Sequence, residues 1–137
     1  MATIRKEIET TARPDDVWAA MRDVGALHTR LVPGFVTDTR LEPGARIVTF
    51  ANGLTVRELI VTVDEAQRRV VWSAVGGSLT HHNGATQVFA AADGGSRIVW
   101  IADLLPDAAA PVIDGMMQQG SAAMKRALDR LAEARQS

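Results

Sequence analysis

The sequence has no cysteine and no tyrosine among its 137 residues. Without cysteine there are no disulfides, thiolate metal sites or cysteine nucleophiles, and without tyrosine no phenol can act as an acid. No apolar run approaches the roughly 18 residues of a membrane-spanning helix. The N-terminus also lacks the apolar stretch of a secretory signal. We therefore expect a cytoplasmic protein without a membrane span.

The sequence also lacks an excess of either charge. Its formal net charge is −1, and acidic and basic residues are interspersed, so we predict no nucleic-acid partner. A nucleophile elbow, a phosphate-binding loop, a dinucleotide-binding glycine motif and a His-Glu-x-x-His pair are all missing. Three scattered histidines are poor material for a metal site. We accordingly predict neither a metal nor a cofactor.

The order of periodic segments is the most informative feature that is present. An apolar fraction of 47% is enough for a core, and the length fits one domain over residues 1–137. A first strand precedes a helix that begins at Pro14 and ends at Gly25, and then a short helical turn. Six strands joined by tight turns lead to one long amphipathic helix. The predicted strands are 3–11, 35–42, 46–52, 54–64, 68–75, 79–91 and 96–104, and the two later helices are 26–31 and 106–134.

Three stretches and the last helix resemble a known superfamily. They are Ile-Glu-Thr-Thr-Ala-Arg-Pro-Asp-Asp-Val-Trp (8–18), Arg-Leu-Val-Pro-Gly-Phe-Val (30–36), Arg-Ile-Val-Trp-Ile-Ala-Asp-Leu-Leu-Pro (97–106) and Met-Lys-Arg-Ala-Leu (124–128). In this respect the chain is similar to the START, polyketide cyclase and pollen-allergen proteins, abbreviated SRPBCC. The resemblance implies an α+β helix-grip fold, in which a curved antiparallel seven-stranded sheet wraps around the C-terminal helix and encloses an apolar cavity. Members bind lipids, sterols, polyketides or plant hormones, and some catalyse cyclisation or dehydration of polyketides.

The strand predicted over residues 79–91 carries the first candidate site. Successive side chains of a strand point to opposite faces, so His81 and His82 cannot grip one metal together. His81 shares a face with Asn83 and Gln87, and this polar row would fix the orientation of a ligand if that face were concave. If the other face is concave, His82 and Thr86 replace it. The alternative for the polar row is a solvated strand.

Charged residues on the neighbouring strands form a second group, Arg46, Arg57 and Glu58. Arg57 shares a face with the apolar Val63, counting by simple alternation, and could anchor a carboxylate or hydroxyl of a ligand. Either Arg57 or Glu58 could instead belong to a cross-strand ion pair, and this interpretation is favoured.

Aromatic and methionine side chains provide the apolar candidates for ligand contact. Trp72 and Trp100 lie in the middle of strands, and their N–H groups favour the edge of a pocket. Methionine adapts to varied apolar shapes, and a glycine inside a helix leaves space or permits close packing. The predicted apolar contacts are Phe50, Trp72, Trp100, Met116, Met117 and Gly120.

Three functions remain open from the sequence. The leading hypothesis is a protein that binds a hydrophobic small molecule, lipid-, polyketide- or aromatic-like, between sheet and helix. An enzyme of the polyketide cyclase or dehydratase type is the alternative, with His81, Glu58 and Asp103 as the available general acids or bases. The third is an interaction module or homodimer without a ligand. It is suggested by strand 96–104, which is apolar on both faces and must be either central and covered on both sides, or covered by a partner on its outer face.

Overall fold

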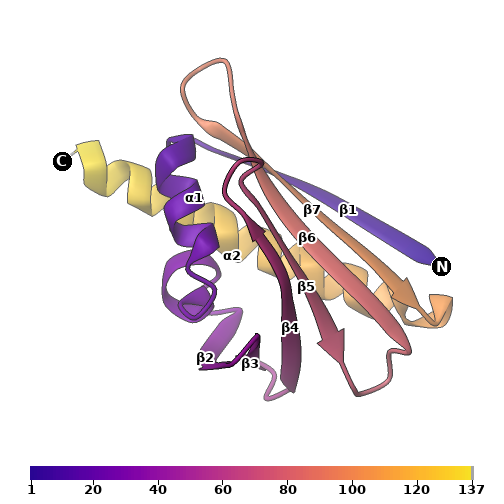
Figure 1. The fold of residues 1–137 in the computed structure, drawn as a ribbon. Coiled ribbons are helices and arrows are strands. Elements are labelled where there is room, and N and C mark those ends of the chain that lie inside the picture. The colour runs from indigo at the N-terminus through magenta and orange to yellow at the C-terminus, as the bar shows by residue number, and fades with distance from the viewer. Residues whose placement is uncertain (137) are drawn as a thin grey trace.

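A computed structural model describes residues 1–136 of the chain. The described residues form one seven-stranded antiparallel sheet in the order β1-β7-β6-β5-β4-β3-β2, with the long helix α2 running across one face (Figure 1). This is the helix-grip fold that the sequence predicted. The strands are β1 (Ala2–Thr10), β2 (Val36–Glu42), β3 (Ala45–Phe50), β4 (Thr55–Asp64), β5 (Arg69–Val75), β6 (His81–Ala90) and β7 (Ser96–Leu105). The helices are α1 (Pro14–Arg22), the π-helical turn η1 (Leu27–Leu31), the 3-10 turn η2 (Asp107–Ala109) and α2 (Ala110–Gln136).

Strand pairing follows from the short links between strands. Each strand from β2 to β6 pairs with the next one, because a link of a few residues can join only antiparallel neighbours. The first strand instead pairs with the last, from Ala2 opposite Leu104 to Thr10 opposite Ser96. Strand β7 therefore lies inside the sheet, and its outward-facing Val99 is only 8% exposed. Ile101 on the same outer face is half-buried, and a partner over this face stays a prediction.

Helix α2 begins four residues later than predicted, at Ala110 instead of residue 106. Pro106 adopts an extended conformation, and η2 follows it before the helix starts. The predicted apolar stripe is otherwise found: Met117, Gly120, Met124 and Leu128 are buried. Met124 and Leu128 pack into the main core with Ile8, Val17, Val48, Val70 and Ile98.

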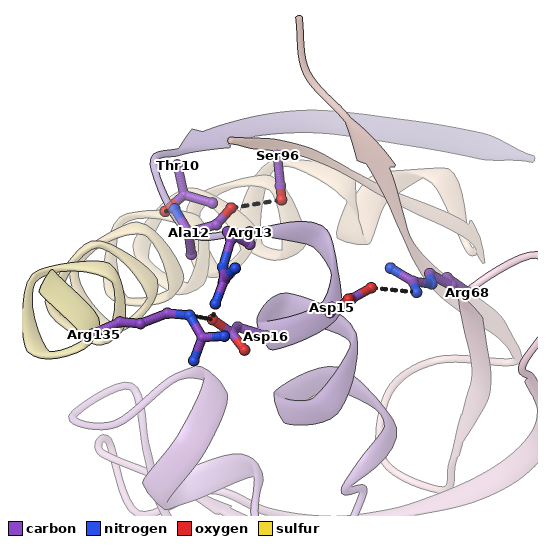
Figure 2. Close-up of polar contacts among 8 residues, drawn as sticks. All are labelled: Thr10, Ala12, Arg13, Asp15, Asp16, Arg68, Ser96 and Arg135. Atoms are coloured by element: carbon purple, nitrogen blue, oxygen red, sulfur yellow. Dashed lines mark hydrogen bonds and ion pairs between the residues drawn. The ribbon is translucent and has the colours of Figure 1, made fainter. Parts of the chain in front are cut away.

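The start of α1 is tied to three distant parts of the chain (Figure 2). Asp15 accepts a 2.6 Å hydrogen bond from Arg68 in the β4–β5 turn. Asp16 forms an ion pair of 3.3 Å with Arg135 near the end of α2. The hydroxyl of Ser96, at the start of β7, donates to the carbonyl oxygen of Ala12 at 2.7 Å. Two acidic residues in the first turn, where carboxylates favour the positive end of a helix dipole, therefore also position α1 against the sheet and α2.

A β-bulge in β4 changes which side chains share a face. The register with β5 shifts between Ile60, opposite Trp72, and Thr62, opposite Val71. Val61 is left unpaired and 57% exposed. Beyond the bulge, Val63 packs with Ile60 against the core. The predicted grouping of Arg57 with Val63 on one face is therefore wrong, because simple alternation does not continue through a bulge.

Candidate ligand cavity

A cavity of about 240 Å³ lies between the concave face of the sheet and the helices. Its wall is mostly apolar, with three titratable side chains among the lining residues: Arg46, Glu58 and His82. Its lining also includes Leu54 in the β3–β4 turn and the segment from Gly76 to Leu79 in the β5–β6 loop. Most ligand pockets share this character, namely apolar walls with a few polar groups that fix orientation.

Five of the predicted contact residues line this cavity: Phe50, Trp72, Trp100, Met116 and Met117. They come from β3, β5, β7 and α2, so the fold brings together side chains that are up to 67 positions apart between Phe50 and Met117. The rings of Trp72 and Trp100 are neighbours, with their centroids 6.4 Å apart. The two rings together form an apolar part of the cavity wall.

Two glycines allow these tryptophan rings to pack directly against the backbone. A Cβ on Gly84 would lie 2.7 Å from the Trp72 indole, and a Cβ on Gly120 would lie 2.9 Å from the ring of Trp100. Both distances are too short for a real Cβ, so each ring rests directly on a glycine backbone. Of the two interpretations considered for Gly120, close helix–sheet packing is therefore the correct one. Gly120 does not leave open space.

The polar row on β6 lies away from the cavity. His81 is exposed, and Asn83, Gln87 and Asp103 border a depression on the opposite, convex face of the sheet. The placement of His81, Asn83 and Gln87 on the concave face was wrong, because that face of β6 carries His82 and Thr86. Two of the candidate acid–base groups, His81 and Asp103, are removed from the cavity by this geometry.

Arg57 is also outside the cavity. Its Nε lies 3.3 Å from Oε2 of Glu42, and both side chains are at least one-third exposed. The prediction of a ligand-anchoring Arg57 is therefore wrong, and the ion-pair interpretation is confirmed. Strand alternation explains the difference, since its neighbour Glu58 points to the concave face.

Glu58 and Arg46 form a buried ion pair in the cavity wall. Nε of Arg46 donates to Oε1 of Glu58 at 2.8 Å, and the two side chains are 4% and 9% exposed. A second nitrogen of Arg46 donates to the carbonyl oxygen of Val24 at 3.2 Å, and the guanidinium lies 5.4 Å from the centroid of Trp72. Burial raises the pKa of Glu58, and the charge and hydrogen bond of Arg46 oppose that rise only in part.

His82 is the third titratable group of the wall, and its orientation is fixed. The backbone N–H of Ala74 donates to its Nδ1 at 3.0 Å, and its own carbonyl oxygen accepts a 2.6 Å hydrogen bond from Ser73. Burial lowers its pKa, as does the neighbouring His81, whereas Asp103 acts in the opposite direction. At neutral pH the imidazole is therefore uncharged.

Among residues 1–136 no group of three or more His, Asp or Glu side chains is arranged to hold a metal ion. In the same part of the chain no helix is long and apolar enough to cross a membrane.

Several solved structures share this fold. The protein XoxI from Bacillus cereus superposes with a TM-score of 0.83 at 19% identity, over 93% of this chain and 96% of that one. A protein from Thermobifida fusca is 26% identical, with a TM-score of 0.75 over 98% and 95% of the two chains. Norcoclaurine synthase from Thalictrum flavum, solved with dopamine and hydroxybenzaldehyde, is 21% identical, with a TM-score of 0.71 over 99% and 88%. No curated protein matches the sequence.

The family comparison agrees with the fold. The profile described as "Polyketide cyclase / dehydrase and lipid transport" matches residues 1–135. This confirms the resemblance to the SRPBCC superfamily that the sequence motifs indicated, and a ligand-binding role in general terms comes with it. The chain belongs to the polyketide cyclase/dehydrase and lipid transport family.

Proposed function

We propose that the protein binds a compact, largely apolar small molecule, bearing at least one polar group, in the cavity between sheet and α2. The observation that carries this proposal is the cavity of about 240 Å³, whose wall combines aromatic and methionine side chains with three titratable side chains. Ligand pockets start at about 300 Å³ for drug-sized molecules. The expected ligand is therefore small, on the scale of one or two fused rings, and a cytoplasmic location is part of the proposal.

The test measures the binding of isopropenylnaphthalene, an uncharged two-ring probe. Binding is detected as a change in the fluorescence of the probe. Met116→Trp places a large ring in the cavity, because Met116 is half-buried and lines it. Gln119→Trp adds the same ring to the same helix at an exposed position and serves as the control. Saturable binding to the wild type and to Gln119→Trp, lost in Met116→Trp, is expected. Binding that survives Met116→Trp would place the probe elsewhere, and failure of both isopropenylnaphthalene and its ketone isostere acetylnaphthalene to bind would contradict the proposal.

A cyclase- or dehydratase-like activity is the second candidate, and the position of Glu58 favours it. Glu58 lines the cavity, and its raised pKa brings the carboxyl closer to the range in which general acids and bases work. A base beside a bound ketone would exchange the protons next to its carbonyl with solvent. Acetylnaphthalene in heavy water is therefore a suitable assay, read by proton NMR. Exchange above the rate in buffer, lost in Glu58→Gln, would support an enzyme, and exchange at the buffer rate would support a binding protein alone.

The open cavity also bears on the interaction-module hypothesis. An interaction module without a ligand would have a filled interior and an apolar outer patch, and the cavity of about 240 Å³ speaks against the first of these. Size-exclusion chromatography with light scattering measures the mass of the protein in solution. A homodimer requires twice the mass of one chain.

A further inference from the structure

We propose that His82 is the polar anchor of the cavity, donating a hydrogen bond from Nε2 to an acceptor oxygen of an uncharged ligand. This inference rests on the proposed function and names the chemistry that the same cavity recognises. The ligand class that it specifies is an apolar molecule with a carbonyl or a similar uncharged acceptor oxygen.

The first step of the argument is the tautomer of His82. Nδ1 accepts the hydrogen bond of the Ala74 N–H, so its lone pair is occupied and it carries no proton. A neutral imidazole then has its proton on Nε2. The tautomer is thus set by a backbone group of β5, which does not change when a ligand enters.

The second step is that the Nε2–H group of His82 is available to donate a hydrogen bond. Among the described residues no side chain or backbone oxygen accepts from Nε2, whereas Nδ1 and the carbonyl oxygen of His82 are both engaged. The residue lines the cavity, so this donor is the polar atom that it can offer to a guest molecule. A donor left without a partner on binding would cost free energy, and therefore the site selects a ligand that satisfies it.

The third step is the charge of the wall. Arg46 and Glu58 form an ion pair with a 2.8 Å hydrogen bond, and Arg46 also donates to the carbonyl oxygen of Val24. His82 is uncharged, so the wall has no free cation to balance an anionic ligand. Bringing a carboxylate into such a cavity would leave a desolvated charge without a partner. An uncharged acceptor therefore fits better than an anion.

The fourth step is the position of His82 relative to the rings. Gly84 follows two residues later on the same face of β6 and is directly opposite Trp72 on β5. Because Trp72 rests on Gly84, its indole lies beside the space that His82 borders. A ring packed against Trp72 would bring a substituent on its edge to the imidazole.

Two substitutions separate the structural from the recognition role of His82. His82→Asn keeps an acceptor at the position of Nδ1 for the Ala74 N–H and removes the donor at Nε2. His82→Gln places an amide donor near the position of Nε2 and loses the Nδ1 acceptor. The exposed His81→Asn is the matched control. The probes are acetylnaphthalene, its alkene isostere isopropenylnaphthalene, and naphthoate as the anion.

The wild type and His81→Asn are expected to bind acetylnaphthalene more tightly than isopropenylnaphthalene by about 2- to 13-fold, the range of one hydrogen bond. The preference should vanish in His82→Asn and persist in His82→Gln, although the latter should unfold at a lower temperature. The NMR signal of an isotope-labelled carbonyl carbon should move downfield on binding to the wild type and less so in His82→Asn, which a purely structural role would not produce.

The possible failures are distinguishable. Equal affinity of the wild type for ketone and alkene, both lost in Met116→Trp, would overturn the anchor and leave the cavity function intact. Naphthoate binding more tightly than the ketone would overturn the uncharged class. If neither uncharged probe binds, the proposed function fails and this inference with it.

Discussion

Replacing Arg46 by methionine tests how the buried ion pair of the cavity wall is balanced. The substitution removes the 2.8 Å hydrogen bond to Glu58, the 3.2 Å hydrogen bond to Val24 and the cation–π contact with Trp72. It leaves the carboxylate of Glu58 buried and without its counter-charge. Removing one partner of a buried pair typically costs about 3–5 kcal/mol. This is a large part of the 5–15 kcal/mol by which domains of this kind are stable.

The loss of stability caused by Arg46→Met should depend on pH, and the pKa of Glu58 determines whether it is larger at low or at high pH. Burial raises that pKa in the folded protein above its ordinary value, and without Arg46 it rises further. A raised carboxyl pKa means that the folded state binds the proton more readily than the unfolded state does. Its favourable contribution is therefore present at low pH and lost as the pH increases through the folded-state pKa. Arg46→Met should accordingly be less destabilising at pH ~5 than at pH ~8.

Urea denaturation followed by tryptophan fluorescence at the two pH values provides the measurement. The control is Arg57→Met on the other face of the sheet, where the exposed pair with Glu42 should contribute about 1 kcal/mol or less. The double substitution Arg46→Met/Glu58→Leu removes both charges and should recover most of the loss. A loss below ~1 kcal/mol in Arg46→Met, or a loss equal at both pH values, would refute this account of the pair.

Three further substitutions test the packing around the cavity. Gly120→Ala gains up to ~1 kcal/mol of helix propensity, but its new Cβ would lie 2.9 Å from the Trp100 ring and push against it. We therefore expect weaker binding of isopropenylnaphthalene, and unchanged affinity would show that the ring can move without altering the cavity. Leu128→Ala removes a side chain with 0% exposure and should cost about 2–5 kcal/mol in urea denaturation, so a smaller loss would mean that the core closes around the gap. Asp16→Asn weakens the partly exposed contact with Arg135 and should cost less than ~1 kcal/mol, with the difference in melting temperature disappearing in high salt; a salt-independent loss would contradict an ion-pair origin.

The sequence alone predicted the elements of the fold because their signals are local. The Pro14 helix start, the turns between strands and the spacing of three and four residues along α2 each depend on neighbours in the chain. The start of α2 was misplaced because Pro106 is compatible with a helix start and also with the extended segment that it adopts. Apolar cavity residues were also found in advance, since Trp72 and Met117 lie where strand and helix patterns are strongest.

The polar residues of the cavity were harder to predict because they depend on which face of a strand is concave. Alternation separates the two faces but does not label them, and a bulge such as the one at Val61 exchanges them partway along a strand. Arg46 was recognised as a charged strand residue, but its burial depends on Glu58 lying opposite it on β4. That pairing is a tertiary contact with no local signal.

The pairing register of β5 with β6 connects the correct prediction for Trp72 with the incorrect one for His81. Trp72 was placed in the cavity, and residues directly opposite one another on antiparallel strands share a face. Because Trp72 is opposite Gly84, the cavity face of β6 must carry residues 82, 84 and 86. A cavity-facing Trp72 and a cavity-facing His81 are therefore incompatible in this register. The β5–β6 loop from Gly76 to Thr80 leaves that register undetermined in sequence, since a strand beginning one residue earlier or later would exchange His81 for His82. The informative signal was Gly84 itself, because a glycine inside a strand marks the close approach of another group, and the indole of Trp72 is that group.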